Sequence, residues 1–127
     1  MIMDNITRSK IFEDRLTSFS ISIILTIKNL PNTTENKIIT SQLVRSSTSI
    51  GANYAEAINA ISKMDFRNKI FISKKEASET RYWLRILEAT NPELDASNEL
   101  GEINELLLIL QKIVSTLKHT KSARVNG

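Results

Sequence analysis

A row of basic side chains within the sequence 63–90 has residue types and spacing that suit the binding of phosphate. Its members recur at intervals of seven and four residues, so a helix would carry them on one flank: Arg67, Lys74, Arg81 and Arg85. Lys118 and Lys121 would extend this row toward the end of the chain. Cationic groups at such intervals can contact phosphates of a nucleic acid, and weak contacts add when an assembly repeats them. The alternative, a solvated face that keeps the protein soluble, remains open at this point.

Few aromatic residues interrupt this row. Phe71 and Tyr82 are the two aromatic residues near it, whereas base-specific binding of single strands normally uses several stacking rings. The row therefore predicts contact with phosphates and low sequence specificity.

A second set of charged residues lies around Ser62, where the sequence predicts a short joint between two helices. If the chain reverses direction there, Arg45 lies level with Glu79, and Glu56 lies level with Lys69. We interpret them as buried or interfacial ion pairs that fix the register, because no nucleophile or set of metal ligands accompanies them. The same structural polar network or oligomer interface is predicted to include Ser49, Asn53 and Glu76.

Trp83, the only tryptophan, lies with Ile72 and Ile86 on one flank of the predicted helix 63–90, about a quarter turn from its core stripe. A tryptophan in such a position more often anchors an interface than stacks on a base. The segment 42–56 also has a second face of small and charged residues. Together these features predict self-association.

Catalysis is not expected from the residue types present. The sole histidine, His119, lies in a basic segment with no carboxylate cluster, and the chain contains no cysteine. A di-iron bundle would need Glu-x-x-His pairs on two helices. Ser46, Ser47 and Ser49 suit close helix packing better than nucleophilic chemistry. We predict a protein that is not an enzyme and uses no metal or cofactor.

Four amphipathic helices must position these residues. Apolar side chains recur three and four positions apart within the ranges 7–30, 35–60, 63–90 and 95–118. Ser62 and Asp65 form a variant of the capping box that begins the third helix. The stripe of the fourth consists of Leu100, Ile103, Leu107, Leu110, Val114 and Leu117. Short joints between long helices predict an all-α, antiparallel up-down-up-down four-helix bundle, a single domain over 1–127 with a frayed tail at 120–127.

Composition is consistent with one soluble domain. A chain of 127 residues with 41% hydrophobic and 24% charged residues can bury one core. The apolar run 21–27 is too short to cross a membrane, and the first residues do not resemble a signal peptide. We expect a cytoplasmic protein without membrane contact. The net charge of +3 permits nucleic-acid binding but does not require it.

Three segments carry a more specific pattern. Residues 42–57 read Gln-x-x-Arg-Ser-Ser-x-Ser-Ile-x-x-Asn-x-x-Glu-Ala, and the segments 62–66 and 75–84 continue the pattern in order. The pattern resembles the bacterial four-helix-bundle proteins, also called the S23 or 23S rRNA intervening-sequence protein family. Ala57 departs from it, since many relatives have glycine there, and this affects local packing alone.

The resemblance implies a ring-shaped homopentamer. It also implies contact with RNA or DNA, because relatives are encoded within intervening sequences of 23S rRNA genes. A more distant similarity, to the accessory variability protein of diversity-generating retroelements, points to nucleic acid and protein partners. The sequence thus predicts a non-enzymatic oligomeric scaffold that contacts nucleic acid through phosphates. The alternative is a protein-binding adaptor or a structural oligomer with no nucleic-acid role.

Overall fold

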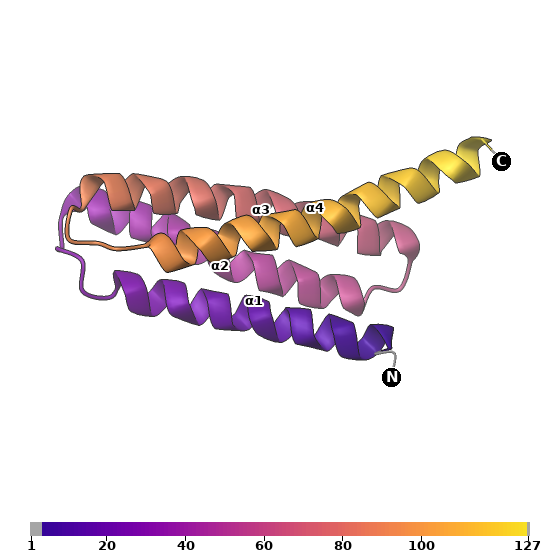
Figure 1. Cartoon of the computed structure of the whole chain (residues 1–127), viewed down its shortest axis with the longest axis horizontal. Coiled ribbons are helices and arrows are strands. Elements are labelled where there is room, and N and C mark those ends of the chain that lie inside the picture. Colours follow the sequence, from indigo (N-terminus) through magenta and orange to yellow (C-terminus); the bar gives the residue numbers. More distant parts are fainter. Residues whose placement is uncertain (1–3, 127) are drawn as a thin grey trace.

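The chain folds into four helices. The structure, a computed structural model, describes residues 4–126, and it describes side chains through residue 117. The helices are α1 (Asn5–Ile27), α2 (Thr34–Ile58), α3 (Lys63–Thr90) and α4 (Ser97–Asn126), shown in Figure 1. None of the described residues is in a strand. The predicted all-α class with four helices is confirmed.

Capping side chains define where the first three helices begin. The Asp4 carboxylate accepts a hydrogen bond from the Thr7 amide, and the Thr33 hydroxyl accepts one from the Asn36 amide. Ser62 accepts in the same way from the Asp65 amide at 3.0 Å, as the sequence predicted for the start of α3. Each cap satisfies an amide that the first helical turn leaves without a partner.

The end of α4 differs from the sequence-based expectation. The helix continues to Asn126, whereas the sequence predicted an end near residue 118. The reason is local, because no proline or glycine interrupts the chain between Gly101 and Gly127. The fraying predicted for residues 120–127 stays a prediction.

Neighbouring helices run in opposite directions (Figure 1). The Thr80 hydroxyl donates to Ser46 Oγ at 2.9 Å, and the Ser73 hydroxyl donates to the Ile50 carbonyl at 2.8 Å. Residue numbers therefore rise along α2 while they fall along α3. These two helices make the most extensive contact in the bundle, whereas α1 and α4 touch least. Small side chains between α2 and α3 allow this close approach.

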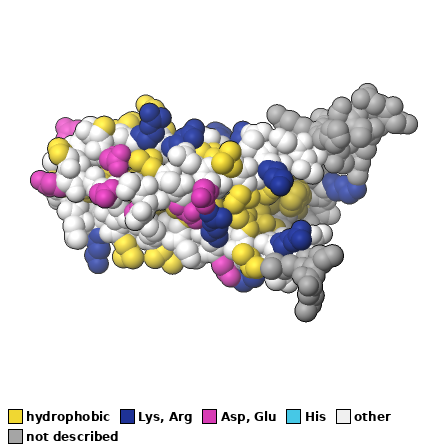
Figure 2. Space-filling view, viewed as in Figure 1, with side chains coloured by type: hydrophobic (Ala, Val, Ile, Leu, Met, Phe, Trp, Pro, Cys, Tyr) yellow, Lys and Arg dark blue, Asp and Glu magenta, His cyan; other side chains and the backbone are white. Residues whose placement is uncertain are grey.

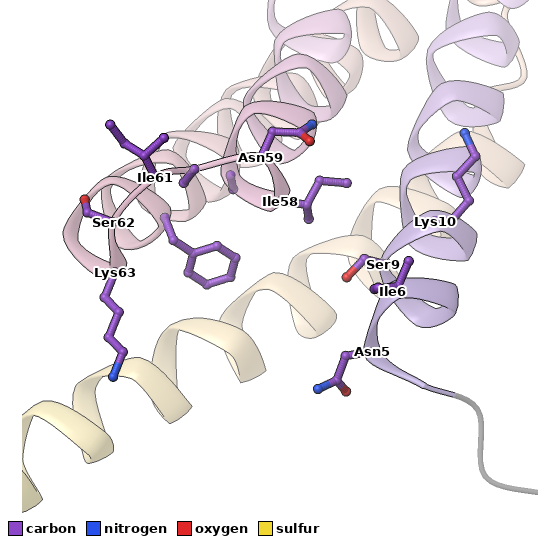
Figure 3. A pocket seen from close by; sticks show the side chains of 12 residues that line it. Asn5, Ile6, Ser9, Lys10, Ile58, Asn59, Ile61, Ser62 and Lys63 are labelled. Carbon is purple, nitrogen blue, oxygen red and sulfur yellow. The ribbon is translucent and has the colours of Figure 1, made fainter.

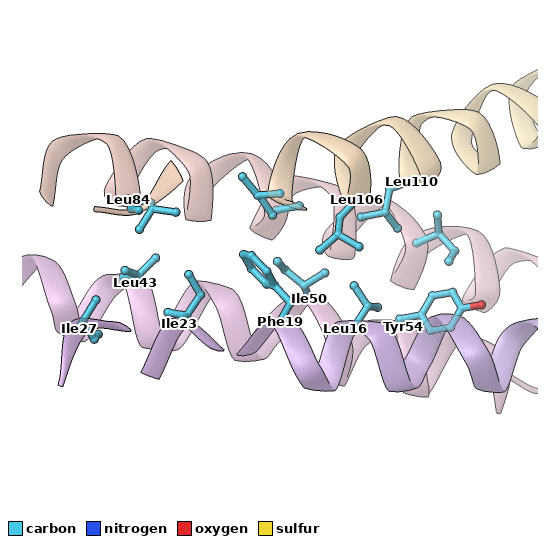
Figure 4. Close-up of a cluster of buried hydrophobic side chains, with 14 of the residues drawn as sticks. Leu16, Phe19, Ile23, Ile27, Leu43, Ile50, Tyr54, Leu84, Leu106 and Leu110 are labelled. Atoms are coloured by element: carbon cyan, nitrogen blue, oxygen red, sulfur yellow. The ribbon is translucent and has the colours of Figure 1, made fainter. Parts of the chain in front are cut away.

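The core is a column of mostly aliphatic side chains drawn from all four helices, together with the aromatic rings of Phe19 and Tyr54 (Figure 4). Ile23, Leu43, Leu84 and Leu106 have no exposed surface. The predicted stripe of α4 is buried at Ile103, Leu110 and Val114 and half-buried at Leu100, Leu107 and Leu117, and it omits Leu106, which is buried. None of the helices, within the described residues, is apolar over a length that would cross a membrane.

Two buried asparagines join the loops at one end of the bundle. Asn36 Nδ2 donates to Asn91 Oδ1 at 2.9 Å, and Asn91 Nδ2 donates back to Asn36 Oδ1 at 3.0 Å. The same amides also donate to the Pro31 and Leu87 carbonyls. Both residues are only 7% exposed. This asparagine pair fixes the loop before α2 against the end of α3.

Candidate functional site

The four described members of the basic row lie along one flank of α3, on the side that faces α4. Arg67 places its guanidinium over the Phe71 ring, 5.4 Å from the ring centroid. Arg81 Nη1 donates to Asn104 Oδ1 on α4 at 3.1 Å. Lys74 is half-buried and Arg85 is exposed. Figure 2 shows Lys and Arg side chains along the upper edge of the molecule, over α3. The side chains of Lys118 and Lys121 lie outside the described residues.

These four cations have no carboxylate partner among the described residues. Arg67 contacts the Phe71 ring and Arg81 contacts the Asn104 amide. Neither contact supplies a negative charge, so both guanidinium groups lack a counter-ion. The flank therefore presents a run of uncompensated positive charge, which attracts anions.

A hollow of about 480 Å³ lies between α3 and α4 at one end of this row. Its lining combines cations, an acid, an amide and two apolar residues: Arg81, Arg85, Glu88, Ala89, Leu100 and Asn104. Glu88 Oε2 accepts a hydrogen bond from the Ala96 amide at 3.1 Å, so this acid is engaged at the start of α4. The sequence did not predict this hollow, because α4 contributes two of its residues.

The charges on the opposite flank of α3 are paired. Arg45 Nη2 lies 2.9 Å from Glu79 Oε2, and Arg45 Nη1 lies 3.4 Å from Glu76 Oε2. Lys69 Nζ lies 2.6 Å from Glu56 Oε2. Both predicted pairs are present within one chain, so the register predicted from a reversal at Ser62 is confirmed.

The exposure of these pairs excludes burial inside one protomer. The side chain of Arg45 is 51% exposed and that of Glu56 is 59% exposed. The interpretation of buried pairs is therefore wrong for the single chain, while a role at an interface between chains stays a prediction. The hydrogen bond that Arg45 donates to the Glu79 carboxylate raises the pKa of Arg45, and the one that Lys69 donates to the Glu56 carboxylate raises the pKa of Lys69. Exposed pairs of this kind contribute little to stability, because water screens both charges.

The remaining members of the predicted network divide into two kinds. The Ser49 hydroxyl donates to the Arg45 carbonyl at 2.6 Å, and Asn53 Nδ2 donates to the Ser49 carbonyl at 2.8 Å, so both bond their own helix. Trp83 is half-buried, and Tyr82 meets it edge to face with ring centroids 5.0 Å apart. Trp83 Nε1 is buried and has no hydrogen-bond partner among the described side chains. A shielded indole with an unpaired donor fits the predicted anchor.

Sequence reasoning missed one ion pair across the seam between α1 and α4. Arg15 donates to both oxygens of Glu102, from Nε at 2.8 Å and from Nη2 at 2.7 Å, and Nη2 also contacts Glu105. A signal was present, because Arg15 sits between the core positions Phe12 and Leu16. Nothing in the sequence, however, identifies which distant carboxylate it meets.

We expect the Arg15–Glu102 pair to make the free energy of unfolding depend on pH. Hydrogen bonds from Arg15 lower the pKa of Glu102 below the ordinary value of 4.5, against the opposing effect of burial. The ion pair stabilises the folded state by about 1 kcal/mol when the pH is above the ordinary pKa of the carboxyl group. This stabilisation is lost as the pH falls through the lowered pKa of Glu102. Urea unfolding of Glu102→Gln should therefore show a smaller loss of stability below pH 4.5 than the parent chain. Identical acid profiles would contradict a role of this pair.

Another hollow, of about 840 Å³, lies where the α2–α3 joint faces the start of α1 (Figure 3). Its lining combines apolar side chains, among them Ile6, Ile58 and Ile61, with polar ones, among them Lys10 and Lys63 at its edge. Lys10 forms a 3.2 Å ion pair with Asp14.

No metal centre is formed by the described residues, since they contain no cluster of three or more His, Cys, Asp or Glu side chains that could hold an ion. His119, the sole histidine of the chain, has a side chain outside the described part. The site that the geometry favours is thus the basic row on α3.

Comparisons with known proteins agree with this architecture. Residues 14–113 match the family model of the 23S rRNA-intervening sequence protein. A solved structure, the crystal structure of a protein with unknown function from the S23 ribosomal protein family of Bacteroides thetaiotaomicron VPI-5482, shares 36% sequence identity. The match covers 80% of this chain and 96% of that one, with a TM-score of 0.72. No curated protein matches the chain significantly. The family model covers most of the chain, and the chain therefore belongs to the 23S rRNA-intervening sequence protein family.

Proposed function

We propose that this protein is a non-enzymatic cytoplasmic scaffold that binds RNA or DNA through phosphates with low sequence specificity. In this proposal the antiparallel up-down-up-down bundle assembles into a ring-shaped homopentamer, and each protomer presents the α3 basic row. The single observation that carries it is the uncompensated charge of that row, described above, beside a flank on which Arg45 and Lys69 are paired with carboxylates. The family name, which refers to a sequence within 23S rRNA, supports RNA as one class of partner.

The two flanks of α3 allow assembly and binding to occur together. Trp83 and the paired charges lie on the flank next to α2, whereas Arg81 and Arg85 lie roughly opposite on the flank next to α4. A partner protomer that covers Trp83 would therefore leave the basic row open. Repetition around a ring would add several weak phosphate contacts into one useful affinity.

The first experiment measures mass and binding together. Light scattering of the purified protein should give a pentamer, and fluorescence anisotropy should detect binding to a structured RNA and to a duplex DNA. If each protomer contacts four phosphates, the affinity of one protomer for nucleic acid should fall about 100-fold as the salt concentration rises from about 50 to 200 mM. The reason is that binding releases counter-ions from the nucleic acid, and added salt opposes this release.

Three results would contradict the proposal in different ways. Binding that does not change with salt would exclude phosphate contact as its main source. A ring that binds neither nucleic acid would favour the adaptor, whose partner is another protein, and a protomer-sized mass would remove the ring.

A further inference from the structure

The hollow between α3 and α4 has the size and lining of a small-ligand site, and it opens beside the basic row. Its 480 Å³ falls within the range of about 300–1,000 Å³ found for such sites. Leu100 and Ala89 supply apolar surface, while Arg81 and Arg85 supply planar cations. A ligand that fits this lining has a flat apolar body, a polar edge and a negative charge beside it.

A nucleotide with an unpaired base has this combination. Guanidinium planes stack on splayed bases, and they also bind phosphate oxygens in a bidentate manner. Asn104 and Glu88 offer amide and carboxylate groups that could meet the polar edge of a base. A base in a duplex cannot enter, because it stays stacked inside the double helix. Stacking of this kind tolerates every base, which agrees with low sequence specificity.

We infer that this hollow receives an unpaired base of single-stranded nucleic acid while the α3 row holds the adjoining phosphates. This inference rests on the proposed function and adds to it a preference for single-stranded segments over duplex. Arg81 is the link between the two parts, since its bond to Asn104 holds its guanidinium at the boundary between the hollow and the row.

The test compares three probes on the same protein: a short single-stranded RNA, a strand of equal length built of abasic sugars, and an RNA duplex. One stacked base per protomer predicts that the intact single strand binds at least about fivefold more tightly than the abasic strand. Ala89→Leu, an exposed position that lines the hollow, fills the space without changing charge. This variant should bind the intact and abasic strands equally and should keep the parent affinity for duplex.

The control variant is Thr17→Leu, which adds an apolar side chain at an exposed position of α1. It should keep the preference for intact single strands. Equal, salt-sensitive binding of intact and abasic strands by the parent protein would overturn the base site and leave phosphate binding intact. An absence of binding to all three probes would overturn both, so the two failures are distinguishable.

Discussion

Replacing the four cations of the basic row with glutamine is expected to lower the affinity for RNA by at least about 100-fold at low salt. The variant carries Arg67→Gln, Lys74→Gln, Arg81→Gln and Arg85→Gln. Glutamine keeps a long polar side chain but cannot displace counter-ions from a phosphate, so the salt dependence should disappear together with the affinity. The fold should survive, because none of the four forms an ion pair within the described chain.

A matched variant separates the row from overall charge. It removes the same number of positive charges at exposed positions outside the row: Arg8, Lys28, Lys37 and Lys75. Anisotropy titrations over a series of salt concentrations should give this control nearly the parent slope. Equal losses in both variants would mean that net charge, and not the α3 row, carries the binding.

Asn36→Ala is expected to lower the free energy of unfolding by about 3 kcal/mol. The substitution removes three hydrogen bonds of the Asn36 side chain, two donated and one accepted, and leaves the buried Asn91 amide without its reciprocal partner. A buried polar group that loses its partner costs about 1–3 kcal/mol in addition to the lost bonds. Urea denaturation followed by circular dichroism would measure the change.

The control and a second variant make this prediction specific. Asn68→Ala, at an exposed position of α3, should change stability by about 0.5 kcal/mol or less. Asn36→Ala combined with Asn91→Ala should cost less than the sum of the two single changes, because the residues share one interaction. Additive losses would show that the two amides act independently.

Local signals predicted the helices and the α2–α3 hairpin. Ser62 identified the joint, and a reversal there placed Arg45 against Glu79 and Glu56 against Lys69, as observed. This succeeded because a very short joint leaves one register between antiparallel neighbours. The basic row was likewise predicted from spacing alone, since helical periodicity fixes which residues share a flank.

Contacts across long sequence separations could not be predicted. Arg15 meets Glu102 and Asn36 meets Asn91 only once all four helices are in place. The same holds for the hollow, whose walls include Leu100 and Asn104 of α4. Such pairs depend on how far each helix is rotated about its own axis. The periodicity of apolar residues gives this rotation only to within about one residue position. Leu106 illustrates this limit, because it is fully buried although the predicted stripe of α4 omits it, whereas the predicted Leu107 is half-buried.

Trp83 gives this protein an optical probe of its own. The chain has one tryptophan, so its long-wavelength ultraviolet emission arises from a single known position. Tyr82, with its ring centroid 5.0 Å from that of Trp83, is close enough to pass excitation to it. Any surface that covers this flank changes the solvent around one indole and hence its emission. The proposed association of protomers and the proposed binding along the opposite flank can therefore be tested separately, with unlabelled protein for the first and labelled nucleic acid for the second.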